Sequence, residues 1–100
     1  MNSIEMKFQQ RLNDAIEEMI SYGYKPQIFI TMCNEEGAVN ASKDVINSEK
    51  ITDGFTRLWE LGKLKLSVEN IIQEPEWHEL FSDDDRKKSK KRLKDYGFEI

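Results

Sequence analysis

The segment Phe8-Gln-Gln-Arg-Leu-Asn-Asp-Ala-Ile-Glu-Glu-Met-Ile20 decides the fold class, because its apolar residues return every three to four positions. Phe8, Leu12, Ala15 and Met19 fall on one side of a helix with about 3.6 residues per turn. Polar side chains fill the other side, as in an amphipathic helix that packs one face against a core. The segment therefore predicts a long first helix.

Capping residues, glycines and prolines divide the remaining chain into more short helices. On these signals we expect helices over residues 3–23, 26–37, 38–47, 52–62, 67–74 and 82–97. The β-branched residues at 28–31 leave a strand possible there, and residues 63–66 are expected to form an extended connector whose two leucines enter the core. The predicted fold class is all-α, a compact single-domain bundle of about five to six short helices spanning residues 1–100.

Size and composition are typical of one folded intracellular domain. One hundred residues with 38% hydrophobic and 10% aromatic content suffice for one modest core. The single cysteine, Cys33, excludes an internal disulfide, and the amino terminus lacks the regions of a secretion signal. No apolar stretch approaches the roughly 20 residues that cross a bilayer. We therefore expect a soluble cytoplasmic protein that does not bind membranes.

Charge is unevenly distributed along the chain. The net charge is −4, but residues 1–85 carry 17 acidic and 8 basic side chains, whereas residues 86–100 carry 7 basic and 2 acidic ones. In the last predicted helix the basic residues follow three aspartates, an order that the helix dipole favours. Ser89, Leu93 and Tyr96 gather on one side of this helix. The other side carries a lysine face, which consists of Lys87, Lys88, Lys90, Lys91 and Lys94.

Three interpretations of the lysine face are open at the level of the sequence. Lysine commonly solvates the outer side of a terminal helix. Several cations on one helix also favour contact with nucleic acid phosphates, or with an acidic protein surface. The acidic remainder of the chain and the lack of interleaved arginine and aromatic residues count against nucleic acid.

The two tryptophans are further candidates for a binding surface, because tryptophan is enriched at interaction hot spots. Trp59 shares a helical face with Phe55 and is expected inside the core. Trp77 lies beside Pro75 and among glutamates, so it is the better surface candidate of the two, although burial in the small core is the outcome expected for it as well. Trp77 therefore joins the five lysines of the lysine face as the candidate binding surface.

No group of residues predicts catalysis, a metal site or a cofactor site. His78 follows Glu74 by four residues, as paired metal ligands on a helix do, but Pro75 intervenes and no third ligand is identified. Cys33 lies on an apolar stripe and far from the sole histidine, so a small core residue is its expected role. Glu69 fits the first turn of a helix better than general acid or base catalysis. We expect a non-enzymatic protein that uses no cofactor.

Two stretches carry a resemblance to other proteins. They are Gly54-Phe-Thr-Arg-Leu-Trp-Glu-Leu-Gly62, followed by its leucine-alternating connector, and the closing Arg92-Leu-Lys-Asp-Tyr-Gly97. With Leu80-Phe81 between them, this pattern resembles a set of small bacterial proteins without an assigned activity, and it covers the chain from about Tyr22 onward. The resemblance implies a bacterial or phage origin and supplies no catalytic residue.

The sequence therefore favours a small macromolecular interaction module, with an unidentified protein as its partner. The alternative is a nucleic-acid-associated accessory protein that uses the lysine face. In either case we expect a monomer or a weak homodimer. The surfaces of opposite charge are expected to orient docking on a partner more than they supply affinity.

Overall fold

The computed structural model describes residues 3–98 and confirms the all-α fold. Six α-helices occur in this part of the chain, namely α1 (Ser3–Ser21), α2 (Gln27–Glu36), α3 (Ala38–Asn47), α4 (Asp53–Glu60), α5 (Val68–Ile71) and α6 (Asp83–Asp95). Two 3-10 turns, η1 (Leu64–Leu66) and η2 (Pro75–Trp77), lie between them. The described residues contain no strand, so residues 28–31 belong to a helix and the strand alternative is wrong.

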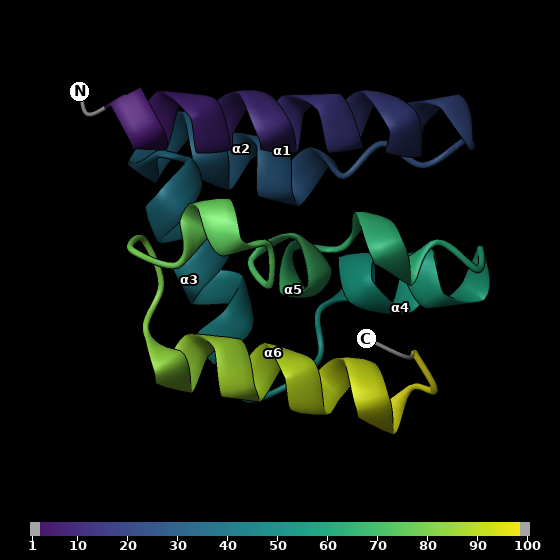
Figure 1. Cartoon of the computed structure of the whole chain (residues 1–100). Helices are drawn as coiled ribbons and strands as arrows, with labels where there is room; N and C mark the ends of the chain where they lie inside the picture. The colour runs from purple at the N-terminus through teal and green to yellow at the C-terminus, as the bar shows by residue number, and fades with distance from the viewer. Residues whose placement is uncertain (1–2, 99–100) are drawn as a thin grey trace.

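The helices are arranged between two opposite edges of the molecule. Figure 1 shows α1 along one edge and α6 along the other, with α3, α4 and α5 between them. The core includes Phe8 of α1, whose ring packs edge to face against Trp77 at 5.4 Å and against Phe81 at 5.2 Å. The radius of gyration of 12.5 Å is what a compact domain of this length gives. Because α1 and α6 form opposite edges, each has one face in the core and one face in solvent.

Helix α1 follows the predicted apolar period. Its buried residues are those of the stripe that the sequence identifies: Phe8, Leu12, Ala15 and Met19. The helix ends before Gly23, whose φ of +88° is a left-handed conformation that glycine adopts without a steric penalty. Within residues 3–98 no helix combines the length and the apolarity that a membrane crossing requires.

The connector between α4 and α5 differs from the expectation. Residues 64–66 form the 3-10 turn η1 in place of an extended segment, and both leucines are buried as expected. The N–H of Ser67 donates to the carbonyl of Leu64 at 3.0 Å, which closes the turn. A 3-10 turn brings Leu64 and Leu66 inward while satisfying its own backbone groups, which an isolated extended segment cannot do.

Candidate functional site

Helix α6 begins with a complete capping box that fixes the position of the lysine face. The hydroxyl of Ser82 accepts the N–H of Asp85 at 3.0 Å, and the Asp85 carboxylate accepts the N–H of Ser82 at 3.1 Å. The N–H groups of Ser82 and Asp85 would otherwise be unpaired at the start of the helix, so the capping box stabilises the first turn. Asp85, Ser89 and Leu93 are buried and hold the inner face of α6 against the core.

All five lysines of the lysine face are exposed, as the predicted helical face requires. Lys88 contacts Asp84 at 3.3 Å and donates to the Asn47 amide oxygen at 2.8 Å, while Lys91 pairs with Asp95 at 2.8 Å. No hydrogen bond or ion pair within residues 3–98 is recorded for the remaining three, Lys87, Lys90 and Lys94. Exposed helical ion pairs contribute only about 0.3–0.5 kcal/mol each, so Lys88 and Lys91 can still exchange their partners.

The two arginines of α6 have a different role from the lysines. The Arg92 guanidinium donates to the carbonyl of Val45 at 2.9 Å and pairs with Glu69 at 3.4 Å. The Arg86 guanidinium donates to the carbonyls of Phe81 at 2.6 Å and of His78 at 3.1 Å. The arginines therefore hold α6 to its neighbours, and the charge available for a partner comes from the lysines.

Trp77 does not belong to the candidate surface. Its side chain is only 3% exposed, and its indole N–H donates to a carboxylate oxygen of Glu74 at 2.8 Å. That carboxylate also binds the guanidinium of Arg11 at 2.9 Å, so an ion pair covers the polar edge of the ring. The expected burial of Trp77 is therefore confirmed, and its place as the better surface candidate is wrong, because the half-buried Glu74 carboxylate accepts its indole N–H.

Trp59 is the exposed tryptophan, at 48% relative exposure, and its predicted burial is wrong. Its ring packs edge to face against Tyr96 at 5.5 Å, and Tyr96 in turn packs against the buried Phe55 at 5.2 Å. Helix α4 buries Phe55 and Leu58, and Trp59 extends from the edge of that face toward the end of α6. The helical face that Trp59 shares with Phe55 therefore predicted its burial incorrectly.

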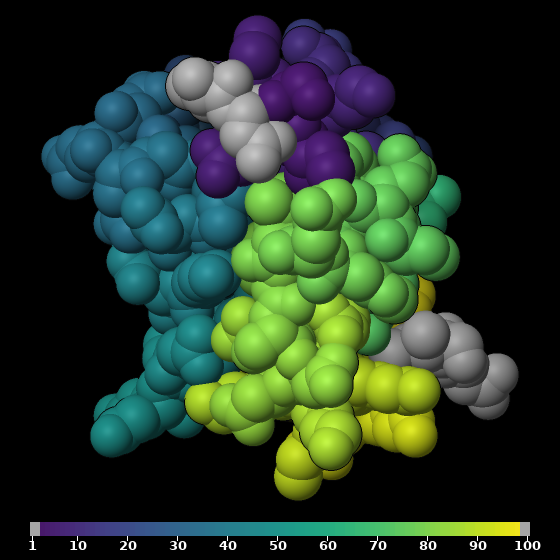
Figure 2. All heavy atoms as spheres, turned by 60° about the vertical axis from the view of Figure 1, so that its left-hand side comes forward, coloured from purple at the N-terminus to yellow at the C-terminus, as the bar shows by residue number. Residues whose placement is uncertain are grey.

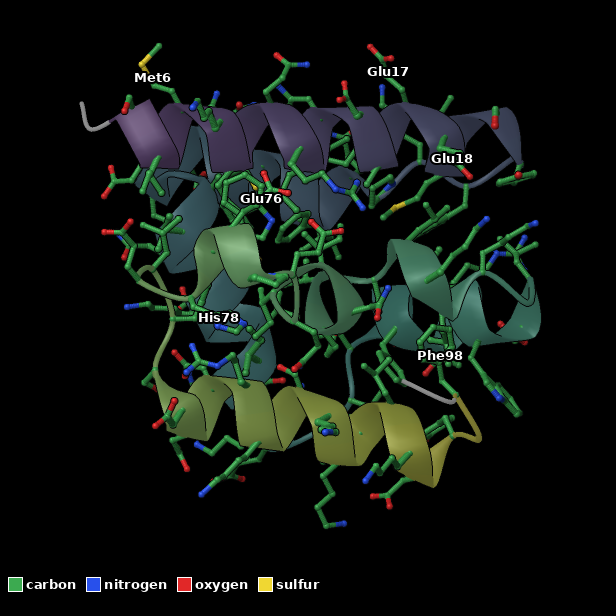
Figure 3. The ribbon with its side chains drawn as sticks, in the orientation of Figure 1. Met6, Glu17, Glu18, Glu76, His78 and Phe98 are labelled. Carbon is green, nitrogen blue, oxygen red and sulfur yellow. The ribbon has the colours of Figure 1, made fainter. Side chains whose placement is uncertain are left out.

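The charged groups of α1 lie on the edge opposite the lysine face. Figure 3 shows Glu17 and Met6 extending outward from α1, and Figure 2 shows α1 and α6 at opposite ends of a second view of the molecule. The outer side of α1 includes exposed Asp14 and Glu17. The molecule therefore presents an acidic edge and a basic edge that face in opposite directions.

Sequence analysis did not identify an apolar cleft between α2 and α4. The cleft has a volume of about 420 Å³ and a predominantly apolar lining. We call it the α2–α4 cleft, and its apolar lining includes Met19, Ile28, Phe29, Met32, Val45, Phe55, Leu58 and Val68. Its polar groups come from Tyr24, Lys25, Gln27, Thr52, Asp53, Ser67 and Glu69. Residues 28–33 carry an apolar stripe that could have indicated this wall of the cleft. Helical periodicity alone, however, assigns such a stripe to the core.

Glu69 is a buried carboxyl in the lining of the cleft. Its residue is 2% exposed, and Arg92 is its cationic partner at 3.4 Å. Burial raises the pKa of Glu69 above its ordinary value, although the charge and the hydrogen bond of Arg92 act in the opposite direction. The cation that faces Glu69 is the guanidinium of Arg92, which also donates to the Val45 carbonyl, so this carboxyl belongs to the contact that joins α5, α3 and α6.

The other residues considered for chemistry lie apart from any reactive group. Cys33 is half-buried, and burial raises the pKa of its thiol to about 11, so the nucleophilic thiolate is scarce at neutral pH. His78 is exposed, and a ring nitrogen lies 3.3 Å from the carbonyl of Gln73. Within residues 3–98 no cluster of three or more histidine, cysteine, aspartate or glutamate side chains is arranged to hold a metal ion.

Comparison of the chain with protein-family models, with curated proteins and with solved structures found no match. Function is therefore inferred from the geometry of the chain itself.

Proposed function

We propose that this protein is a non-enzymatic interaction module, and that its lysine face docks on an acidic surface of another protein. The observation that carries the proposal is that all five lysines are exposed on a helix whose inner face is fixed by Asp85, Ser89 and Leu93. A partner that binds this face would not need to order α6, so less binding free energy would be lost to conformational entropy.

The opposite charges of the two edges support an oriented encounter. Exposed cations accelerate association with an acidic surface, and the acidic edge at α1 repels the same surface. The partner would therefore approach from the α6 side. Because the lysines are exposed, the attraction should weaken as salt is added, with a screening length of about 8 Å at physiological ionic strength.

Nucleic acid is the second candidate for the same surface. Lys87, Lys90 and Lys94 recur every three to four residues and form a stripe of about 10 Å along the helix, which phosphates can neutralise. Asp84 and Asp95, however, pair with two of the other lysines and place carboxylates within this surface. These carboxylates would repel phosphates and acidic side chains alike, so they do not separate the two candidates. We rank a protein partner first because the lysine face includes no arginine or aromatic side chain of the kind that nucleic-acid surfaces interleave with lysine.

The proposal is tested with a triple variant, Lys87→Gln, Lys90→Gln and Lys94→Gln. The matched control is Lys7→Gln, Lys50→Gln and Lys65→Gln, which removes the same charge from three exposed lysines outside α6. Each protein is immobilised and exposed to nuclease-treated extract of the organism that encodes it. We expect the wild type and the control to retain one stoichiometric protein, and the α6 variant to lose it.

Two results would contradict the proposal. In the first, the wild type retains a protein from untreated extract and loses it from nuclease-treated extract. If purified RNA or DNA also binds the wild type with a steep salt dependence, and this dependence is weaker for the α6 variant, the second candidate is correct. If the α6 variant retains the same proteins as the control, the lysine face only solvates the helix.

A further inference from the structure

The α2–α4 cleft is a concave apolar site that the proposed function does not use. Its volume of about 420 Å³ lies in the range of roughly 300–1,000 Å³ that small-molecule sites occupy. Ser67, Val68 and Glu69 in its lining are buried, whereas Lys25 and Ile28 are exposed, so the cleft has a deep end and an end open to solvent.

The polar groups at the deep end already have partners. The Ser67 hydroxyl donates to a backbone carbonyl at 2.7 Å, and the Thr52 hydroxyl accepts a backbone N–H at 3.2 Å. The carboxylate of Glu69 is paired with Arg92 at 3.4 Å. An ionised group that entered the deep end would lose its hydration and gain no free counter-charge. The deep end therefore favours an uncharged, apolar occupant.

Helix α2 forms one wall of the cleft and packs mainly along α3. It contributes no buried residue to the core, and Ile28 is 75% exposed at the rim of the cleft. Gly23 and Gly37 flank the segment in left-handed conformations, with φ of +88° and +90°. A molecule in the cleft would cover apolar surface of α2 that folding leaves partly exposed, so binding should also order this helix.

We propose that the α2–α4 cleft binds a small uncharged organic molecule with an apolar body of about the size of a few fused rings. The cleft is a single local concavity, whereas a stable protein partner covers about 800 Å² on each side. The polar part of the ligand lies at the open end near Lys25 and Asp53, where water still reaches both side chains. This site is independent of the lysine face and does not require the proposed protein partner.

The test uses the full-length protein and 1-aminoanthracene, an uncharged fluorescent probe. We expect saturable binding of one probe per chain, with a blue shift of its emission. Hydrogen exchange should slow in α2 when the probe is bound. Anthracene-2,6-dicarboxylate carries a negative charge at each end of its ring system, so one carboxylate must enter the deep end. It should bind at least about tenfold more weakly, because the deep end offers no unpaired cation.

Two cleft variants and one matched control locate the site. Met32→Trp fills the cleft from α2 and should weaken probe binding by about tenfold or more. Ile28→Asn changes only the exposed rim, is not expected to affect folding, and should weaken binding severalfold. Ile20→Asn removes an exposed isoleucine outside the cleft lining and should leave the affinity unchanged.

Several outcomes would overturn the inference. These are non-saturable binding to the folded wild type, equal losses for Ile28→Asn and Ile20→Asn, or equal affinity for the charged and uncharged probes. If the probe does not bind and an apolar peptide binds the cleft tightly, the cleft is a site for a protein segment. That result would also reject the small-molecule site.

Discussion

The burial of side chains in helices α2 and α6 is the reverse of what the compositions of the two helices suggest. Helix α2 is rich in isoleucine, phenylalanine and methionine, yet none of its residues is buried. Helix α6 consists mainly of lysine, arginine and aspartate, yet it buries Asp85, Ser89 and Leu93. The comparison shows that a few well-placed residues anchor a polar helix, while an apolar helix at the edge of a bundle can keep surface free for binding.

Polar contacts account for the firm attachment of α6. Its serine and arginine side chains bond backbone carbonyls within α6 and in α3, with Ser89 donating to the Asp85 carbonyl at 2.9 Å and Arg92 to the Val45 carbonyl at 2.9 Å. Helix α2 packs mainly along α3. The predictions below separate the contributions of the two helices to stability and to binding.

The largest effect is expected from Leu93→Ala in α6. Leu93 has no exposed surface, and a cavity at such a site costs about 3–5 kcal/mol of unfolding free energy. Phe29→Ala in α2 is the comparison, since Phe29 is only partly buried, and it should cost clearly less. Urea denaturation followed by circular dichroism measures both. An equal loss at Phe29 would show that α2 is anchored as firmly as α6.

The second effect concerns the ion pair between Arg92 and Glu69. Arg92→Met leaves the Glu69 carboxylate buried without its cation, which should cost about 2–4 kcal/mol at neutral pH. The double variant Arg92→Met with Glu69→Met should recover most of this loss, because the uncompensated charge is absent. Urea denaturation of the three proteins tests the coupling, and additive losses would show that the two side chains act independently.

The burial of Glu69 beside Arg92 makes the unfolding free energy depend on pH. Since burial raises the pKa of Glu69 above 4.5 in the folded state, the folded protein holds this proton more tightly than the unfolded chain. Glu69 therefore lowers the unfolding free energy as pH rises from 4.5 through the folded pKa. The decrease should be steeper in Arg92→Met and absent in Glu69→Gln, when denaturation midpoints are measured across this interval. A flat profile in Arg92→Met would contradict the burial of the charge.

A smaller effect is expected from Asp85→Ala at the capping box. Burial acts to raise the pKa of Asp85, but hydrogen bonds from Ser82 and Asn47 outweigh it and lower the pKa below 3.8. Loss of this carboxylate should cost about 1 kcal/mol near neutral pH. The stabilisation is complete above 3.8 and is lost as pH falls through the folded pKa, so wild type and variant should converge there. Thermal unfolding at several pH values is the measurement.

The smallest effect on stability is expected from Ile28→Asn in α2. An exposed side chain outside the core changes unfolding free energy by no more than about 0.5 kcal/mol. If urea denaturation shows a loss near that of Leu93→Ala, α2 contributes to the core in solution and the comparison between the two helices fails.

The fold class and most helix limits could be predicted from the sequence, because they depend on local interactions. The stripe from Phe8 to Met19 and the capping box at Ser82 act over a few neighbouring residues, and the structure confirms both. The exposure of the lysine face follows in the same way from the helical period and the position of Leu93.

The burial of individual side chains was decided only by the tertiary structure. Trp77 is buried because Arg11 and Glu74, 63 residues apart, close over its indole. Trp59 remains exposed because the ring of Tyr96 covers only part of it. The α2–α4 cleft likewise needs residues from five helices to form its walls. Helical period assigns a residue to a face of its own helix, but only the packing of distant helices determines whether that face meets protein or solvent.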